Sequence, residues 1–170
     1  AEQDLPAAAR LHDVTAPVLS FAPWIVPPAG EEAPAAAGPE APAFLLHTSG
    51  TTARPKRVVL TQGRICQSAH VIARSLQLGP GDRCLTGMPM FHVHGILNAM
   101  SSTLVSGGSF AHCGAFDTIG FYQHMKNLRP TWIKAVPTMY HSLAARPELV
   151  PSVPGLRLLR SSSAPLSSSS

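Results

Sequence analysis

Residues 46–60 read LHTSGTTARPKRVVL, a polar loop with apolar residues on both sides. The apolar runs FLL at 44–46 and VVL at 58–60 predict two strands that this loop joins. Inside the loop, Gly50 lets the backbone approach a ligand closely, the hydroxyls can donate hydrogen bonds, and Lys56 adds a charge-assisted one. The loop therefore has the groups that hold phosphate oxygens, although it lacks the Gly-Lys-Ser/Thr ending of the common P-loop. Composition alone would also fit a polar surface turn.

Segments with helix and strand patterns alternate after this loop. Helices are expected over residues 62–78, 95–105, 118–128 and 137–145. Strands are expected over residues 83–86, 109–113, 131–136 and 156–159. Thr61 and Asp117 are suitable N-caps, and the glycine pair at 107–108 is typical of a helix end. The alternation predicts an α/β layered fold with a largely parallel sheet.

The domain organisation follows from composition. Residues 1–42 are rich in alanine and proline and form a linker-like segment, in which only 18–26 could be a short ordered piece. Order is therefore expected to begin at Ala43. Residues 43–166 form one predicted domain, because a chain of 170 residues that is 45% apolar is long enough for a single core. Residues 167–170 form a serine tail.

Charge, hydropathy and cysteine content argue against several classes of protein. The net charge is +4, but the cations are scattered, so nucleic-acid binding is not expected. The apolar stretch 91–116 is interrupted by histidine, serine and glycine and predicts no membrane span. The start has no basic region followed by an apolar run, so no signal peptide is expected. Three cysteines without CxxC spacing favour reduced thiols and a cytoplasmic location.

Residues 88–95 read MPMFHVHG, and their two histidines raise the question of a metal site. Imidazoles at positions i and i+2 can share one face of an extended chain, as a metal pair requires. A third ligand would be needed, and His112 is the nearest histidine, with no Asp or Glu between Asp82 and Asp117. A structural role for these histidines is favoured, and no metal ligand is predicted.

Residues 161–166 read SSSAPL and follow the apolar segment 156–159. Together with 48–56 and 88–95, in this order, they resemble the three signatures of the adenylate-forming superfamily of acyl-CoA synthetases, aryl-CoA ligases, luciferases and peptide-synthetase adenylation domains. The resemblance covers about residues 44–166 and implies a partial N-terminal AMP-binding domain. The string FHVHG at 91–95 is most similar to the oxalate–CoA ligase group, which points to a small carboxylic acid as substrate.

The resemblance assigns roles to individual residues. Segment 48–56 would hold the β- and γ-phosphates of ATP, and segment 161–166 would leave room for adenine and the acyl group. The implied nucleotide-binding residues are Thr48, Ser49, Gly50, Thr51, Thr52, Arg54, Lys56, Ser162, Ser163, Ala164 and Pro165. His92 would be the catalytic residue that gates the acyl pocket and orients the carboxylate, and Phe91 would line that pocket. The implied reaction uses ATP, Mg²⁺ and CoA.

Two departures from the family pattern lower the expected activity. Ala53 and Arg57 stand where the family usually has glycine, and a side chain at a position with positive φ costs about 1 kcal/mol. The family's Mg²⁺-binding Glu, ribose-binding Asp and catalytic Lys follow the third signature, so we interpret the chain as an internal fragment that completes neither half-reaction alone. A non-catalytic nucleotide-binding remnant is the alternative, ahead of a histidine-based metalloprotein. The sequence does not distinguish CoA from a carrier-protein thiol.

Overall fold

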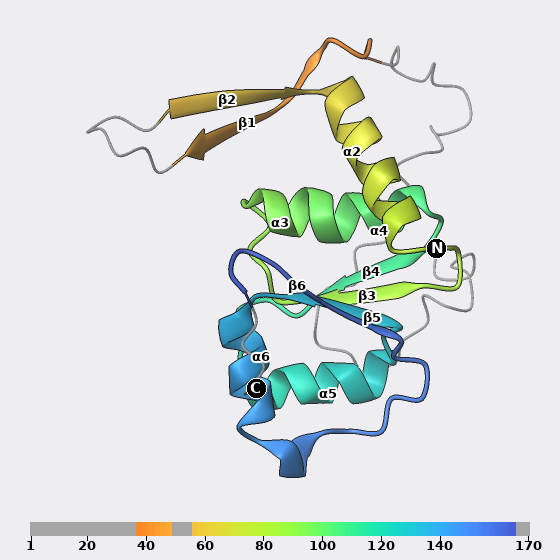
Figure 1. The fold of residues 1–170 in the computed structure, drawn as a ribbon, viewed down its shortest axis with the longest axis vertical. Coiled ribbons are helices and arrows are strands. Elements are labelled where there is room, and N and C mark those ends of the chain that lie inside the picture. Colours follow the sequence, from red (N-terminus) through yellow and green to blue (C-terminus); the bar gives the residue numbers. More distant parts are fainter. Residues whose placement is uncertain (1–36, 49–55, 166–170) are drawn as a thin grey trace, which may run out of the picture.

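The computed structural model describes residues 37–48 and 56–165, which form a three-layered α/β unit and a separate hairpin. Four parallel strands form the sheet in the order β4-β3-β5-β6. They are β3 (Arg83–Thr86), β4 (Ser109–His112), β5 (Trp132–Ala135) and β6 (Leu158–Ser161). Figure 1 shows helices on both faces of this sheet. The predicted α/β layered fold with a parallel sheet is confirmed.

Each face of the sheet packs on its own group of helices. Alternate strand residues point to opposite faces, so Leu85 and Ile133 pack against α5 (Thr118–Leu128) and α6 (Pro137–Ala144). Cys84, Phe110 and Trp132 pack on the other face, against the helical segment that ends in α4 (Ser102–Val105). The residues Leu76 and Leu78, which follow α2 (Gln62–Ser75), join this cluster, and α2 itself packs on the α4 segment. The sheet is thus the middle layer between two apolar clusters.

The polar loop at 48–56 joins two strands, as the sequence predicts. β1 (Pro42–Thr48) pairs antiparallel with β2 (Lys56–Thr61), and this hairpin stands away from the parallel sheet at the start of α2 (Figure 1). Arg57 lies opposite His47 in the ladder and has the negative φ of an ordinary strand residue. The expectation that Arg57 occupies a glycine-like conformation is therefore wrong, because strand pairing fixes its backbone.

The end of α2 and the capping by Thr61 differ from the sequence prediction. α2 ends at Ser75 rather than at residue 78, because Gln77 takes a left-handed conformation with φ 51°. Thr61 has the extended backbone of an N-cap but makes no side-chain capping bond, whereas the Asp117 side chain caps α5 by accepting from Gly120 N at 2.7 Å. Capping by Asp117 is thus confirmed.

The helix expected over 95–105 is not uniform. It consists of a short α-helical turn α3 (Val93–Gly95), a π-helical stretch (Ile96–Ser101) and α4. Only glycine fits at position 95, because the Cβ of any other residue would lie 2.4 Å from the carbonyl oxygen of Pro89. The close approach holds the loop after β3 against the start of this helical segment. The segment ends at Gly107, whose φ of 79° fits the predicted glycine stop.

Candidate functional site

The carboxyl ends of β5 and β6 meet the helical segment after β3 in a cluster of polar side chains. In parallel α/β sheets, ligands bind outside the carboxyl ends of the strands. Here Ser162 Oγ lies 2.9 Å from His94 Nδ1 and also accepts a hydrogen bond from Lys134 Nζ. Asn98 Nδ2 lies 3.2 Å from the same His94 nitrogen. We call His94, Asn98, Lys134 and Ser162 the polar cluster; it joins segments 88–95 and 161–166.

The hydrogen bonds in the polar cluster have a direction. A lysine ammonium can only donate, so Ser162 Oγ accepts from Lys134 and has its own proton free for His94. Burial, followed by the nearby Lys134 charge, lowers the pKa of His94, which keeps its imidazole neutral. The single lone pair of His94 Nδ1 then faces both the Ser162 hydroxyl and the Asn98 amide, which share it or compete for it, and the ring proton is on Nε2.

His92 lies at the outer side of the polar cluster. Its imidazole stacks on that of His94, with ring centroids 5.0 Å apart, and its Nδ1 accepts from the backbone nitrogen of His94 at 3.2 Å. The His92 side chain is exposed, so a ligand can reach it. The adjacent Phe91 is 82% exposed, and it does not line the apolar cavity between α5 and α6.

Of the predicted residues at 162–165, the structure brings one into the polar cluster. Ser162 is half-buried, whereas Ser163, Ala164 and Pro165 are exposed. Ser163 has a φ of 81°, a left-handed conformation that favours glycine.

The predicted phosphate-binding residues are mostly outside the described residues. Ser49, Gly50, Thr51, Thr52 and Arg54 lie there, as does Ala53. Thr48 and Lys56 are the last pair of the β1–β2 ladder, and only their backbone is described. Their predicted role toward ATP phosphates stays a prediction.

The histidines do not gather a metal site in the described ranges, where no three metal-binding side chains converge. Both ring nitrogens of His112 are occupied by backbone groups, since Nε2 lies 2.9 Å from Met88 O and Nδ1 accepts from Gly114 N at 3.1 Å. His112 therefore holds the loop after β3 and is not a third ligand beside His92 and His94.

Sequence reasoning did not single out Lys134, which is fully buried on β5. Burial, with a further contribution from the positive charge of Arg160, lowers the pKa of Lys134 to about 8. Burial also lowers the pKa of Arg160, whose Nη1 lies 3.5 Å from Asn98 O. The available signal was a lysine inside the otherwise apolar string WIKAV, at a strand expected to be buried.

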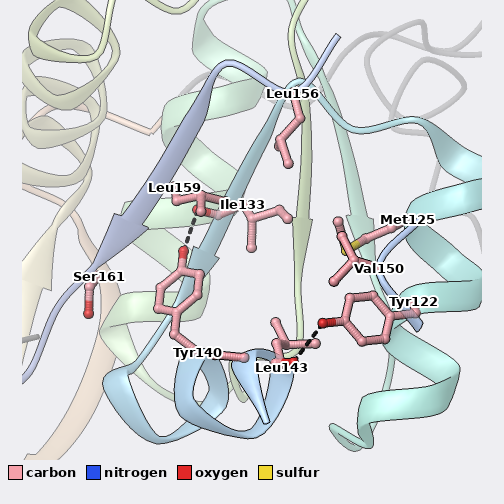
Figure 2. Close-up of a pocket in the computed structure, with 10 residues that line it drawn as sticks. Tyr122, Met125, Ile133, Tyr140, Leu143, Val150, Leu156, Leu159 and Ser161 are labelled. Atoms are coloured by element: carbon pink, nitrogen blue, oxygen red, sulfur yellow. Dashed lines mark hydrogen bonds between the residues drawn. The ribbon is translucent and has the colours of Figure 1, made fainter. Parts of the chain in front are cut away.

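A separate apolar cavity of about 320 Å³ lies on the other face of the sheet, between α5, α6 and the strands β5 and β6 (Figure 2). Its lining comprises Tyr122, Met125, Ile133, Tyr140, Leu143, Ala144, Val150, Leu156, Leu159 and Ser161. The Tyr122 hydroxyl donates to Leu143 O at 2.7 Å, and the Tyr140 hydroxyl lies 3.1 Å from Ile133 O. The cavity can hold an apolar group, but no charged side chain lines it.

Comparison with known proteins identifies the family. The family model for AMP-binding enzymes matches residues 2–170 of this chain, including the segment 1–42 that the composition marks as linker-like. The chain belongs to the AMP-binding enzyme family. The resemblance stated from the three segments is thereby confirmed.

Relatives within the AMP-binding family are CoA ligases. Sulfoacetate–CoA ligase of Cupriavidus necator is 35% identical over 95% of this chain and 28% of its own length. Oxalate–CoA ligase of Arabidopsis thaliana is 39% identical over 75% of this chain and 26% of its own length. The chain thus spans about a quarter of the length of these curated relatives.

Solved structures place the fold in the same family. A malonyl-CoA ligase in a ternary product complex with methylmalonyl-CoA and AMP matches 76% of this chain and 29% of its own, with 36% identity and a TM-score of 0.67. The N-terminal domain of FACL13 from Mycobacterium tuberculosis matches 82% of this chain and 35% of its own, with 27% identity and a TM-score of 0.71. AMP-binding ligases of this kind use ATP and CoA. No helix in the described ranges has both the length and the apolar character needed to cross a bilayer.

Proposed function

We propose that this chain forms part of the nucleotide and acyl site of an ATP-dependent ligase, which activates a carboxylic acid as an acyl-adenylate and transfers the acyl group to CoA. One observation carries most of the weight: the contact between Ser162 Oγ and His94 Nδ1, which joins two family segments at the ligand-binding edge of the sheet. The names of the relatives, with sulfoacetate, oxalate and malonyl groups, support a short-chain acid as substrate.

The proposed chemistry requires two anions to meet. A carboxylate oxygen attacks the α-phosphorus of ATP, and the bond from that phosphorus to the bridging oxygen breaks to release pyrophosphate. The CoA sulfur then attacks the acyl carbonyl carbon, and the bond to AMP breaks. Positive charge and hydrogen-bond donors must stabilise the charge that develops in each step.

We assign residues of this chain to those tasks. Arg54 and Lys56 neutralise the β- and γ-phosphates, and the neighbouring hydroxyls and the Gly50 backbone donate hydrogen bonds to them. His92, exposed at the outer side of the polar cluster, orients the carboxylate that is activated. Residues 162–165 leave space for adenine beside the sheet edge.

Mg²⁺ is not given a ligand in this proposal. In the described ranges no group of three metal-binding side chains exists, and the polar cluster contains no carboxylate. Hard oxygen ligands are what Mg²⁺ requires, so we derive no step through it here. Nucleotide binding without turnover is therefore the second candidate function for this chain by itself.

Nucleotide titration of the 170-residue chain tests the proposal. We expect ATP to bind, and we expect Lys56→Ala to weaken binding about tenfold, which corresponds to about 1.4 kcal/mol. Lys126→Ala, which removes an exposed lysine on α5, is the matched control and should leave the dissociation constant unchanged. Equal affinity of the parent and Lys56→Ala would remove Lys56 from its role.

Pyrophosphate exchange with ATP and a panel of short acids separates the two candidate functions. We expect no exchange by the chain alone, because it spans about a quarter of the length of the curated ligases it matches. Exchange above the blank would show that the chain by itself performs the first half-reaction. Absence of any nucleotide binding would refute both candidates.

A further inference from the structure

Two cations lie next to each other on the face of the sheet that carries the polar cluster. Lys134 on β5 and Arg160 on β6 are register partners in the parallel pairing, so their side chains leave the sheet on the same side. Lys134 is completely buried, and Arg160 is half-buried. The electrostatic repulsion between them adds to the cost of burying the ammonium group.

Neither cation has an acidic partner among the described residues. The ion pairs found there are Arg146–Glu148 and Arg157–Asp82, and both are formed by other side chains. The nearby Cys84 does not compensate the charge, because burial raises the pKa of its thiol and keeps it neutral. Lys134 Nζ instead donates to Ser162 Oγ and, at 3.4 Å, to the carbonyl oxygen of Ala135.

A buried ammonium paired only with neutral oxygens is unfavourable. An unpaired buried charge costs several kcal/mol, and such charges are usually paired or neutralised. Lys134 keeps its proton at neutral pH, since its pKa is lowered only to about 8. The site is therefore short of one negative charge, at a sheet edge where ligands bind.

Partly exposed polar side chains adjoin this buried charge. Ser162 is half-buried, and its Oγ accepts from the fully buried Lys134 Nζ. His94 and Asn98 are half-buried as well, with His94 Nδ1 2.9 Å from Ser162 Oγ and 3.2 Å from Asn98 Nδ2. The Ser162 hydroxyl and the Asn98 amide are hydrogen-bond donors that an anion at this place could use besides the ammonium.

We propose that Lys134, with Arg160 beside it, binds a second anionic group on the acid substrate, so that the ligase selects short acids with a carboxylate or sulfonate besides the activated carboxylate. This inference rests on the proposed function. His92 at the outer side serves the activated carboxylate, and Lys134 lies deeper, behind Ser162. An acid with one charged group leaves Lys134 unpaired, and an acid with two supplies the missing charge.

The test compares malonate with its monomethyl ester, which has nearly the same shape and one charge fewer. Each is titrated into the 170-residue chain at pH 7, and binding is followed by amide chemical shifts. We expect malonate to bind at least tenfold more tightly than the ester. Lys134→Met should abolish this preference, and Lys126→Met, on the exposed face of α5, should retain it.

Several results would overturn the proposal. They are equal affinity for malonate and ester, a preference that survives in Lys134→Met, or no binding of either acid. Lys134→Arg keeps the charge and serves as the second variant if Lys134→Met does not fold; it should retain at least part of the preference. Inorganic phosphate is titrated in parallel, and phosphate binding that depends on Lys134 while malonate binding does not would assign the charge to the nucleotide.

The two proposals can fail separately. ATP affinity and its dependence on Lys56 report on the ligase assignment, whereas the preference for malonate reports on Lys134. If ATP does not bind but the preference for malonate is observed, Lys134 belongs to an anion site on a chain that does not bind nucleotide. If ATP binds through Lys56 but malonate and its ester bind equally, the ligase assignment stands and the acid substrate belongs to a different class.

Discussion

The two ends of the parallel sheet hold charge in opposite ways. At the amino ends of the strands, Asp82 accepts from Arg157 Nε at 2.9 Å and from Arg157 Nη2 at 2.8 Å. Thr131 Oγ1 and the backbone nitrogen of Gly79 also donate to Asp82, at 2.6 and 2.8 Å. At the carboxyl ends, Lys134 and Arg160 are adjacent cations without an acidic partner in the described part of the chain.

The difference separates a charge that stabilises the fold from one that is available to a ligand. The hydrogen bonds from Arg157 lower the pKa of Asp82 to about 2, which means that the folded chain favours its ionised form. Burial lowers the pKa of Lys134, which means that the folded chain disfavours its ionised form. Groups with strongly perturbed pKa values are concentrated at functional sites, and structural ion pairs such as Asp82–Arg157 perturb pKa values as well.

Removal of the paired charge should have the largest effect on stability. We expect Asp82→Ala to lower the free energy of unfolding by about 2–3 kcal/mol, because it leaves Arg157 and Thr131 without their acceptor. The estimate is at the low end because the Arg157 side chain is 41% exposed. Urea denaturation monitored by tryptophan fluorescence measures it.

The matched control is Glu148→Ala in the exposed Arg146–Glu148 pair. It should leave the urea midpoint unchanged, because exposed ion pairs contribute little. If Glu148→Ala lowers the free energy of unfolding as much as Asp82→Ala does, the hydrogen bonds of Asp82 are not the cause of the larger effect expected for Asp82→Ala.

Removal of the Lys134 charge should raise the stability of the fold rather than lower it. We expect Lys134→Met to raise the free energy of unfolding by about 1–2 kcal/mol at pH 7, since an apolar side chain replaces an uncompensated buried cation. Lys126→Met on the exposed face of α5 is the control and should change little.

The pH dependence of this gain follows from the pKa of Lys134, about 8 in the folded chain against 10.5 for the free side chain. Between these values the unfolded chain binds more protons, so the stability of the parent rises with pH. The advantage of Lys134→Met should therefore be full below pH 8 and shrink toward pH 10.5. The groups that surround the ammonium are Arg160, Cys84, Ser162 and His94. A constant difference across this range would contradict the assignment of the gain to the Lys134 charge.

The smallest expected effect concerns backbone conformation at the same end of the sheet. Ser163 has a φ of 81°, so Ser163→Gly should stabilise the fold by about 0.5 kcal/mol through relief of left-handed strain. Ser142→Gly, within α6, should instead destabilise it by about 0.5 kcal/mol. Thermal unfolding should show a raised melting temperature for Ser163→Gly and a lowered one for Ser142→Gly. A lowered melting temperature for Ser163→Gly would show that contacts of the serine side chain offset the strain of its left-handed backbone.

Much of the fold could be predicted because its signals are local. The apolar runs around 48–56 gave the hairpin, and the alternation of strand and helix patterns gave the parallel sheet. Asp117 was recognised as a cap because a cap contacts nitrogen atoms within its own first turn. The family segments were recognised for the same reason, since each is a continuous string.

Other features depend on partners that are distant in the sequence. Ser162 lies 28 residues from Lys134 and 68 residues from His94, so the polar cluster exists only when β5, β6 and α3 are assembled. Arg57 was misjudged because its conformation is set by pairing with His47 across the hairpin. The π-helical stretch Ile96–Ser101 likewise has no pattern in its apolar sequence that separates it from an α-helix.

The sequence by itself determined the family and the layered α/β architecture. These depend on short-range periodicity and on contiguous segments, which are readable along the chain. Only the tertiary structure decided that Lys134 is a buried cation next to Arg160, with no acidic partner among residues 37–48 and 56–165, and that Asp82 is paired with Arg157. The physical reason is that burial and charge pairing depend on what the fold places around each group.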